Sequence, residues 1–410
     1  MSSNLHRRLV GSGLPPKGPT PVGSGRSGAR SGPRSARDYS PLPWSKYFEA
    51  QTSLELDSDH AFHLYSIGLQ PSSPTHPDSP APAPPSPVMV LLHGGGFSGL
   101  TWALTAQALA HKVRVRVLAL DLRGHGQTRT SKDHDLSAEV MAQDVIRVLR
   151  HQFPEELPEI VLVGHSMGGA LAVHAALTHQ IDRLLGVCVI DVVEGSAMEA
   201  LGTMQGFLRS RPDKFPSLEN AIEWDVRSGQ VRNAESARVS MPGQLKNIET
   251  QVPATIDIDQ GTTSTANPGQ DVVMAAPADA IPEEEEETSG EFKAPSPVSV
   301  RASAPKSGYT WRIDLARSEY YWPGWFQGLS NKFLSVPCAK LLLLAGVDRL
   351  DRDLTVGQMQ GKFQMQVLPQ AGHAVQEDMP DQVADILATF LVRNKFAQPA
   401  DDFERTFPAC

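Results

Sequence analysis

The sequence predicts an α/β fold in which a mostly parallel central sheet carries helices on both faces. Runs of Val, Leu and Ile recur along the chain, as in Val88–His93, Arg116–Leu122 and Leu184–Asp191. Segments with the apolar spacing of a helix lie between these runs, and glycine-rich turns follow several of them. Strands that are apolar throughout and alternate with amphipathic helices are typical of a parallel sheet that is covered on both faces.

The expected elements follow one another in this alternating order. Strands are expected at residues 88–93, 116–122, 159–164, 184–191, 340–348 and 363–369, and helices at 135–153, 169–179 and 380–396. The alternation stops between about residues 195 and 334, where helical pieces and the aromatic stretch YYWPGWFQGLS occur. We interpret this interval as a cap that is inserted over the sheet.

Composition divides the 410 residues into one folded domain and several segments of low complexity. Residues 1–38 are expected to form a disordered tail, because they are rich in Gly, Ser, Pro and Arg and poor in apolar side chains. Residues 39–410 are expected to form a single domain with two interruptions. The first is a proline-rich stretch at residues 70–87, interpreted as an elongated hairpin loop between two apolar runs. The second is a disordered acidic insertion at about residues 247–308.

Charge and cysteine content argue against several classes of protein. The formal net charge of −9 gives no indication of nucleic-acid binding. Three cysteines do not make a disulfide framework and fit a reducing compartment. No run of about 18 apolar residues indicates a membrane span, and the N-terminal residues lack the apolar core of a signal peptide. We expect a cytoplasmic protein, with the nucleus as a second location.

One serine stands between glycines in the stretch EIVLVGHSMGGALAVHA, residues 159–175. Gly164, Ser166 and Gly168 form a G-x-S-x-G pattern, with an apolar run before it and a helix of small residues after it. In that context the pattern predicts a sharp strand-to-helix turn that presents the serine oxygen as a nucleophile. The alternative interpretation is a glycine turn with a purely structural role.

A second glycine-rich stretch, HGGG at residues 93–96, follows the apolar run that begins at Val88. Acyl transfer needs N–H donors that point at the oxyanion formed during the reaction, and no side chain obstructs a glycine amide. The amides of Gly95 and Gly96 are therefore candidate donors, together with the amide of Met167, the residue after the predicted nucleophile. A plain tight turn is the alternative.

The candidate general base is His373. It follows the last apolar run and precedes the closing helix, where the third member belongs in the order serine, acid, histidine. Three other histidines fit less well: His93 belongs to the glycine loop, His165 lies inside the serine turn, and His125 lies on the loop RGHGQT.

Two carboxylates are candidates for the acid that holds the imidazole. Asp191 ends the run LLGVCVID, and Asp348 ends the run LLLLAGVD one strand later. Either could orient the histidine and stabilise its protonated form. Topology alone favours Asp348, and the spacing of apolar residues does not decide between the two.

With these residues assembled, the chain resembles the protein phosphatase methylesterases, serine hydrolases of the α/β-hydrolase fold. The resemblance covers nearly the whole chain outside the tails and the two low-complexity segments. It rests on stretches such as LVGHSMGGALAVH, VIDVVEGSAMEAL and GKFQMQVLPQAGHAVQED, and on cap stretches such as SLENAIEWDVRSGQVRN. The cap stretches make the resemblance specific, because generic hydrolases have no counterpart to them.

The resemblance implies a triad of Ser166, His373 and Asp191, with Asp348 as the second choice for the acid. It implies hydrolysis of the methyl ester on the C-terminal leucine of the protein phosphatase 2A catalytic subunit, through an acyl-enzyme and without a metal or organic cofactor. It also implies binding to that phosphatase and its holoenzymes, alignment of the triad upon binding, and a monomer in the absence of the partner. The glutamates at 283–287 then suggest a docking motif, with a solvating acidic loop as the alternative.

Two other functions fit the same residues. A generic serine esterase or peptidase would share Ser166, His373 and the glycine loop, because a fold does not fix a substrate. A non-catalytic inhibitor of the phosphatase would share the cap but would not need an intact nucleophile and base.

Overall fold

The computed structural model describes residues 37–69, 86–261, 308–346, 350–400 and 403. Apart from residues 37 and 38, all of these belong to one compact unit, Tyr39–Cys410. The predicted tail up to residue 36, most of the proline-rich stretch 70–87, the acidic part of the insertion and Asp348 lie outside the described residues. None of the described helices is long and apolar enough to cross a membrane.

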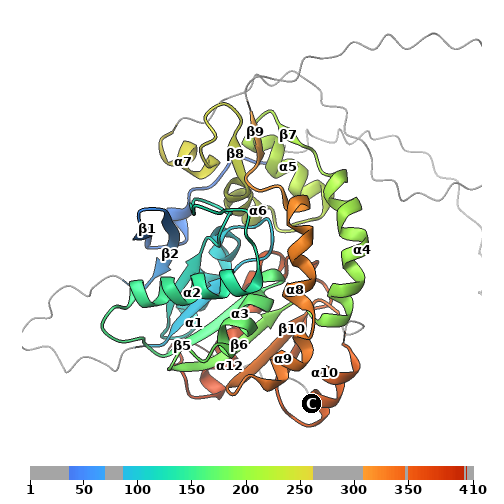
Figure 1. The fold of residues 1–410 in the computed structure, drawn as a ribbon. Helices are drawn as coiled ribbons and strands as arrows, with labels where there is room; N and C mark the ends of the chain where they lie inside the picture. Colours follow the sequence, from blue (N-terminus) through green and yellow to red (C-terminus); the bar gives the residue numbers. More distant parts are fainter. Residues whose placement is uncertain (1–36, 70–85, 262–307, 347–349, 401–402, 404–410) are drawn as a thin grey trace, which may run out of the picture. The chain divides into compact units, whose positions relative to one another are not determined.

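Eight strands of the described chain form the main sheet, in the order β1-β2-β4-β3-β5-β6-β10-β11 (Figure 1). Their bounds are β1 Ala50–Asp57, β2 His60–Ile67, β3 Val88–Leu92, β4 Arg116–Leu120, β5 Ile160–His165, β6 Leu184–Ile190, β10 Ala339–Leu344 and β11 Gln364–Val367. All neighbouring pairs from β4 to β11 are parallel, and only the pairs β1–β2 and β2–β4 are antiparallel. The predicted mostly parallel sheet is therefore confirmed.

The prediction of a hairpin at residues 70–87 is wrong. These residues connect β2 to β3, but β4 lies between the two strands: Ile67 is paired with Val117, and Val88 is paired with Arg116. The connection is therefore a crossover past one strand. The physical reason is that β4 returns from a helix and pairs in parallel with β3, which leaves its other edge for the antiparallel β2.

Helices cover both faces of the sheet. Helices α1 (Ala103–Lys112) and α12 (Pro380–Arg393) pack on one face, and α2 (Ala138–Gln152), α3 (Met167–Leu177) and α9 (Leu329–Ser335) pack on the other. Figure 1 looks onto the face that carries α2 and α3. Neighbouring strand residues point to opposite faces, so Val90 packs with α2 and α3 while Leu91 packs with α1 and α12. Double-sided burial explains why a central strand such as β3 is apolar throughout, whereas the edge strands β1 and β11 contain polar residues.

The predicted cap begins after β6 with α4 (Glu194–Ser210) and continues with α5 (Leu218–Ser228) and α6 (Ala234–Ser240). It also holds a small antiparallel sheet in the order β7-β9-β8, from Lys214–Phe215, Tyr309–Trp311 and Leu245–Asn247. The small sheet, α5 and α6 share a separate hydrophobic cluster, which includes Phe215, Ile222 and Tyr309. In Figure 1 this part of the cap lies above the main sheet, and α4 runs down its right flank beside α8 (Trp322–Phe326).

The predicted N-terminal boundary of the insertion, about residue 247, is too early. Residues 248–261 continue from β8 into a turn and into α7 (Ala254–Asp259). The Asn247 side chain accepts the N–H groups of Glu249 and Thr250, and Ala254 is buried in the cap cluster. A polar turn and one apolar contact therefore order a stretch whose composition resembles a loop.

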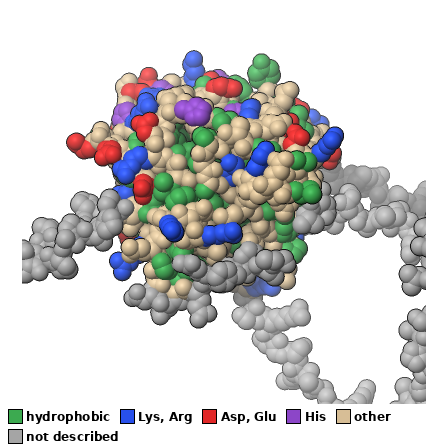
Figure 2. Space-filling view, turned by 90° about the horizontal axis from the view of Figure 1, so that it is seen from below, with side chains coloured by type: hydrophobic (Ala, Val, Ile, Leu, Met, Phe, Trp, Pro, Cys, Tyr) green, Lys and Arg blue, Asp and Glu red, His purple; other side chains and the backbone are tan. Residues whose placement is uncertain are grey.

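The remaining helices complete the C-terminal part of the unit. They are α10 (Arg352–Met359) and α11 (Val375–Asp378). Short 3-10 turns occur in other parts of the unit, such as Gly99–Trp102 after β3 and Leu315–Tyr321 before α8. Figure 2 views the unit from below, where Lys, Arg, Asp and Glu side chains are interspersed with apolar ones. The described part of that face therefore carries charges of both signs.

Candidate active site

Ser166 lies on a sharp turn between β5 and α3. It is the N-cap residue of α3 and has φ 52° and ψ −120°, a backbone conformation that a residue with a side chain rarely adopts. Its N–H donates to the carbonyl of Ile190 at 2.9 Å, which ties the turn to β6. The flanking glycines are required by close packing: a Cβ on Gly164 would lie 2.1 Å from the Gly168 carbonyl oxygen, and one on Gly168 would lie 2.3 Å from that of Leu92.

Asp191 and His373 meet at the C-terminal ends of neighbouring strands. Asp191 follows β6 with φ 51°, and its N–H donates to the carbonyl of Leu343 at 2.8 Å. Its Oδ1 accepts the N–H of Ala345 at 2.9 Å, and its Oδ2 lies 2.8 Å from Nδ1 of His373. The Asp191 side chain is fully buried, whereas that of His373 is 53% exposed. A buried carboxylate thus holds one nitrogen of an imidazole whose other end is open.

The structure describes the two candidate acids unequally. Asp191 contacts His373, and Asp348 lies outside the described residues. The geometry therefore supplies an acid partner for the imidazole at Asp191, in agreement with what the family resemblance implies.

A pocket of about 410 Å³ brings the three side chains together. Ser166, Asp191 and His373 line its floor, and α4 with its neighbours supplies the wall: Val192, Ser196, Ala197, Ala200, Thr203, Met204, Phe207 and Phe326. Among the hydrogen bonds of the described residues, none joins the side chains of Ser166 and His373. A larger surface hollow of about 730 Å³ between β11 and α12 contains none of the three residues, so we place the candidate site in the smaller pocket.

The candidate oxyanion donors do not have equal hydrogen bonding. The Gly96 N–H donates to Nε2 of the buried His125 at 3.0 Å, so this amide is already engaged. The amides of Gly95 and Met167 have no hydrogen-bond partner among the described residues. Gly95 also lies close to Met167, because a Cβ placed on it would be 3.8 Å from the Met167 sulfur. Of the three candidates, Gly95 and Met167 therefore carry the amides that remain available to donate.

His165 supports His373, a role that no pattern in the sequence indicated directly. Its Nε2 lies 2.8 Å from the backbone carbonyl of His373, and because a carbonyl only accepts, this nitrogen carries the hydrogen. Burial lowers the pKa of His165 to about 3, so the ring is neutral at physiological pH. The one indication of this role in the sequence is that His165 directly precedes the predicted nucleophile, Ser166.

In chemical terms, the floor of the pocket offers a hydroxyl on a strained turn and an imidazole held by a buried carboxylate. The glycine loop lies against Ser166, because a Cβ placed on Gly94 would be 3.3 Å from the Ser166 Cβ. This set can take up a proton from the hydroxyl and can stabilise a negative oxygen, as acyl transfer requires.

Comparison with known proteins places the chain in a family. The model of the alpha/beta hydrolase family matches residues 89–386. "Protein phosphatase methylesterase 1" of Homo sapiens is 50% identical over 403 residues and covers 97% of each chain. The protein of the same name from Mus musculus is 49% identical with the same coverage. A third, from Aspergillus fumigatus, is 37% identical over 87% of this chain and 73% of its own.

Solved structures agree with the fold. E-2-(acetamidomethylene)succinate hydrolase matches with a TM-score of 0.56 at 15% identity, over 84% of this chain and 99% of its own. An esterase of Mycobacterium tuberculosis matches with a TM-score of 0.51 at 17% identity, over 84% and 92%. At such identities the likeness concerns the fold alone. The family model and the curated relatives carry the assignment further, and the chain belongs to the protein phosphatase methylesterases, a group of esterases within the α/β-hydrolase family.

Proposed function

We propose that this esterase removes the methyl ester from the C-terminal leucine of the protein phosphatase 2A catalytic subunit. The observation that carries the proposal is the 2.8 Å contact between His373 Nδ1 and Asp191 Oδ2, in a pocket that also contains Ser166. The names of the relatives support a phosphatase methyl ester as the substrate. The apolar wall, with Ala197, Met204 and other side chains, offers a suitable surface for leucine.

In the proposed mechanism, Nε2 of His373 takes the proton of Ser166 while the serine oxygen attacks the leucine carbonyl carbon. The amides of Gly95 and Met167 stabilise the oxyanion that forms. Asp191 holds the imidazole through Nδ1 and stabilises its protonated form. As the carbonyl re-forms, the methoxy group leaves with the histidine proton as methanol, and the leucyl acyl group stays on Ser166.

Water completes the reaction. His373 takes a proton from the water, the resulting hydroxide attacks the acyl carbon, and the protonated histidine returns a proton to the Ser166 oxygen. The products are a free C-terminal carboxylate and the original enzyme. The side chains of Ser166 and His373 share the pocket without a hydrogen bond between them, so we propose that binding of the phosphatase brings them into contact.

The test is an assay of wild type and Ser166→Ala on carboxymethylated phosphatase 2A, with release of the methyl group as the readout. Removal of the attacking oxygen is expected to lower the rate on the order of 10⁵- to 10⁶-fold. The matched control is Ser335→Ala, an exposed serine at the end of α9, which should behave as wild type. Undiminished demethylation by Ser166→Ala would exclude this serine as the nucleophile.

Two further measurements on the same proteins, small-ester hydrolysis and inhibition of the phosphatase, separate the rival functions. A wild-type protein that rapidly hydrolyses small esters but leaves the phosphatase methylated would be a generic esterase. A Ser166→Ala protein that binds the phosphatase and suppresses it as fully as wild type would point to inhibition that does not depend on the ester chemistry.

A further inference from the structure

Two segments beside the candidate oxyanion donors hold each other through a pair of buried histidines. The first segment is the glycine loop, residues 93–96, and the second is the β4 loop, residues 121–128. The Gly96 N–H donates to Nε2 of His125 at 3.0 Å, and the Leu122 N–H donates to Nε2 of His93 at 2.9 Å. Each segment thus contributes one histidine and one amide. We call these two reciprocal hydrogen bonds the histidine clasp.

The protonation of both rings follows from their other contacts. Nδ1 of His93 lies 2.8 Å from the Gly94 carbonyl, and Nδ1 of His125 lies 2.8 Å from the Arg123 carbonyl. Because carbonyl oxygens only accept, each Nδ1 carries the hydrogen and each Nε2 is free to accept an amide. Burial lowers the pKa of His125 to about 4 and that of His93 well below its usual value, so both rings stay neutral. The ring centroids are 4.9 Å apart.

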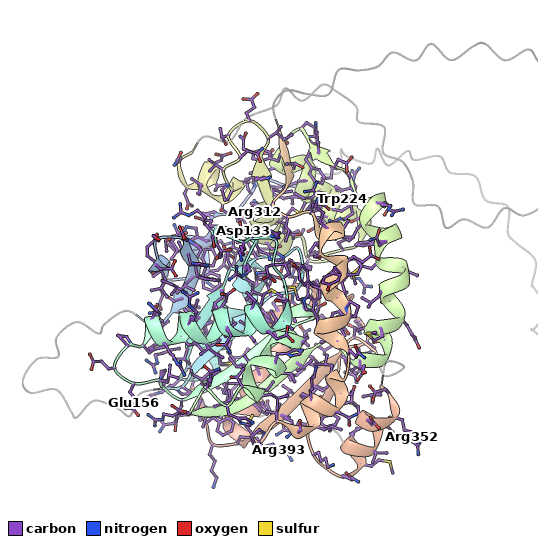
Figure 3. All side chains as sticks on the ribbon, viewed as in Figure 1. Asp133, Glu156, Trp224, Arg312, Arg352 and Arg393 are labelled. Carbon is purple, nitrogen blue, oxygen red and sulfur yellow. The ribbon has the colours of Figure 1, made fainter. Side chains whose placement is uncertain are left out.

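Further contacts fix the β4 loop itself. The buried carboxylate of Asp121 accepts the N–H of Gly99 at 2.7 Å, a second tie to the segment after the glycine loop. Arg312 of the cap donates to the Gly126 carbonyl at 3.1 Å and pairs with Asp133 at 3.0 Å; Figure 3 labels this pair. His125 is therefore carried by a segment that both the sheet and the cap hold in place.

The clasp has a direct consequence for the candidate oxyanion donors. Gly96 has φ 84°, and its amide is turned towards His125. The orientation of the Gly96 amide fixes the peptide unit before it, which begins at Gly95. The Gly95 amide, one residue earlier, has no intramolecular partner among the described residues, and a Cβ placed on Gly95 would lie 3.8 Å from the Met167 side-chain sulfur. Without His125, the Gly96 N–H would be left unpaired in a buried place and the loop would turn to satisfy it.

We infer that His125 is a positioning residue: by accepting the Gly96 N–H, it orients the glycine loop so that the Gly95 amide faces the oxyanion. This inference rests on the proposed acyl-transfer function, in which Gly95 and Met167 are the donors. It does not depend on the identity of the ester, because the oxyanion of every acyl transfer at Ser166 would occupy the same place.

Two polar substitutions separate the two hydrogen bonds of His125. In His125→Gln the side-chain amide reaches the position of Nε2 and can accept the Gly96 N–H. In His125→Asn the shorter amide reaches only the position of Nδ1, so it keeps the Arg123 contact and loses Gly96. The matched control is His134→Asn, an exposed histidine in the same connection between β4 and α2.

The first measurement is kcat/KM for 4-nitrophenyl acetate, a small activated ester. Loss of a whole oxyanion donor costs on the order of 10²- to 10³-fold, and misplacement of one should cost less. We expect His125→Asn to lose on the order of 10- to 100-fold, His125→Gln to stay within about five-fold of wild type, and the control to be unchanged.

The second measurement distinguishes positioning from general damage to the fold. A trifluoromethyl ketone adds to the serine and forms an oxyanion, whereas the corresponding secondary alcohol binds without forming one. The inhibition constant of the ketone should rise by the same factor as kcat/KM falls, while that of the alcohol should not change. Thermal midpoints of all variants are recorded alongside.

The inference is overturned if His125→Gln and His125→Asn lose activity equally, if neither loses any, or if ketone binding is unchanged in an impaired variant. If His125→Asn does not fold, His125→Gln decides alone, because a loss beyond about five-fold would contradict the role of Nε2 as the acceptor. An incorrect assignment of the substrate would give a different result. The protein would then hydrolyse 4-nitrophenyl acetate and leave the methyl ester on the phosphatase.

Discussion

The floor of the candidate pocket and one of its walls are held in different ways. Ser166, Asp191 and His373 stand on turns whose backbone or side-chain groups bond to neighbouring strands, and Asp191 is buried. Helix α4, which supplies most of the wall, has no buried residue along its 17-residue length. In Figure 1 it runs along the flank of the unit, in contact with α8.

The difference indicates a division of labour. A change in the floor alters the positions of the reacting groups. Even a small misplacement of these groups lowers the reaction rate strongly, because catalysis depends on their orientation. A change in α4 removes contact area with the bound acyl group but leaves the reacting groups in place. Substitutions in the two regions should therefore differ in size, in their dependence on the substrate and in their effect on stability.

The largest effect that bears on this comparison is expected for Asp191→Asn. The Asn oxygen can still accept the N–H of Ala345, but its NH₂ group would face the hydrogen on Nδ1 of His373 and favour the wrong tautomer. We expect kcat/KM for the methylated phosphatase to fall on the order of 10⁴-fold without loss of the fold. Steady-state kinetics and a thermal melt check both points.

Asp348→Asn is the matched control for this prediction, because Asp348 is the other candidate acid. Its activity should stay within about three-fold of wild type, because, with Asp191 as the acid, the substitution removes a charge that has no part in the reaction. The reverse ranking of the two variants would assign the acid to Asp348 and would remove Asp191 from the floor of the site.

Local patterns predicted the turns and strands on which the candidate site lies. The G-x-S-x-G turn, the glycine loop and the apolar strands are short-range features, because the steric needs of one turn or the burial of one strand determine them. The sequence therefore led to Ser166 at the end of β5, His373 after β11 and a mostly parallel sheet.

Long-range contacts account for what the patterns missed. The hairpin expected at residues 70–87 is a crossover because β4, a later strand, pairs with both β2 and β3. His125 accepts an amide from a loop 29 residues earlier, and β9 pairs with β7 and β8 across the insertion. Such contacts depend on the folded topology and leave no periodic signal in the sequence. The contact between Asp191 and His373, which are 182 residues apart, is of the same long-range kind.

A moderate effect is expected for Phe207→Ala in α4. Phe207 lines the pocket and is 50% exposed, so its removal takes contact area from a bound leucine and little from the core. We expect kcat/KM for a leucine methyl ester peptide to fall on the order of 10-fold, with little change for 4-nitrophenyl acetate. The free energy of unfolding should change by less than about 1 kcal/mol.

Met198→Ala is the control for the wall. Met198 is also exposed on α4, but it is not among the residues that line the pocket. It should leave both substrates unaffected. An equal loss on both substrates in Phe207→Ala would mean that α4 positions the reacting groups, and the contrast between floor and wall would fail.

Helix α6 of the cap is attached to the rest of the unit more firmly than α4 is. The Glu377 carboxyl group is fully buried, and its two oxygens lie 2.5 Å from the Thr101 hydroxyl and 2.6 Å from the Ser240 hydroxyl. Thr101 follows the glycine loop, and Ser240 ends α6 of the cap. The Ser236 hydroxyl donates to the Glu377 carbonyl at 2.8 Å, so α6 has two contacts to the residue that lies four positions after His373.

The smallest effect on activity is expected for Glu377→Gln, whose consequence lies in stability. Burial raises the pKa of Glu377 from 4.5 to about 8, so the folded protein retains a proton that the unfolded chain releases above pH 4.5. Stability from this group is complete below pH 4.5 and is lost as the pH rises through 8, with a slope on the order of 1.4 kcal/mol per pH unit. Glu377→Gln mimics the protonated group and should flatten this slope while activity at neutral pH is retained. Asp225, whose pKa burial also raises, keeps part of the pH dependence of stability in the variant.

Denaturant titrations between pH 6 and 9 measure this pH dependence of the free energy of unfolding, with Glu199→Gln at an exposed position of α4 as the control. An unchanged slope in Glu377→Gln would show that Glu377 is ionised in the folded protein. Charge-assisted hydrogen bonds donated by Thr101 and Ser240 would then hold this carboxylate, in place of a neutral carboxyl group.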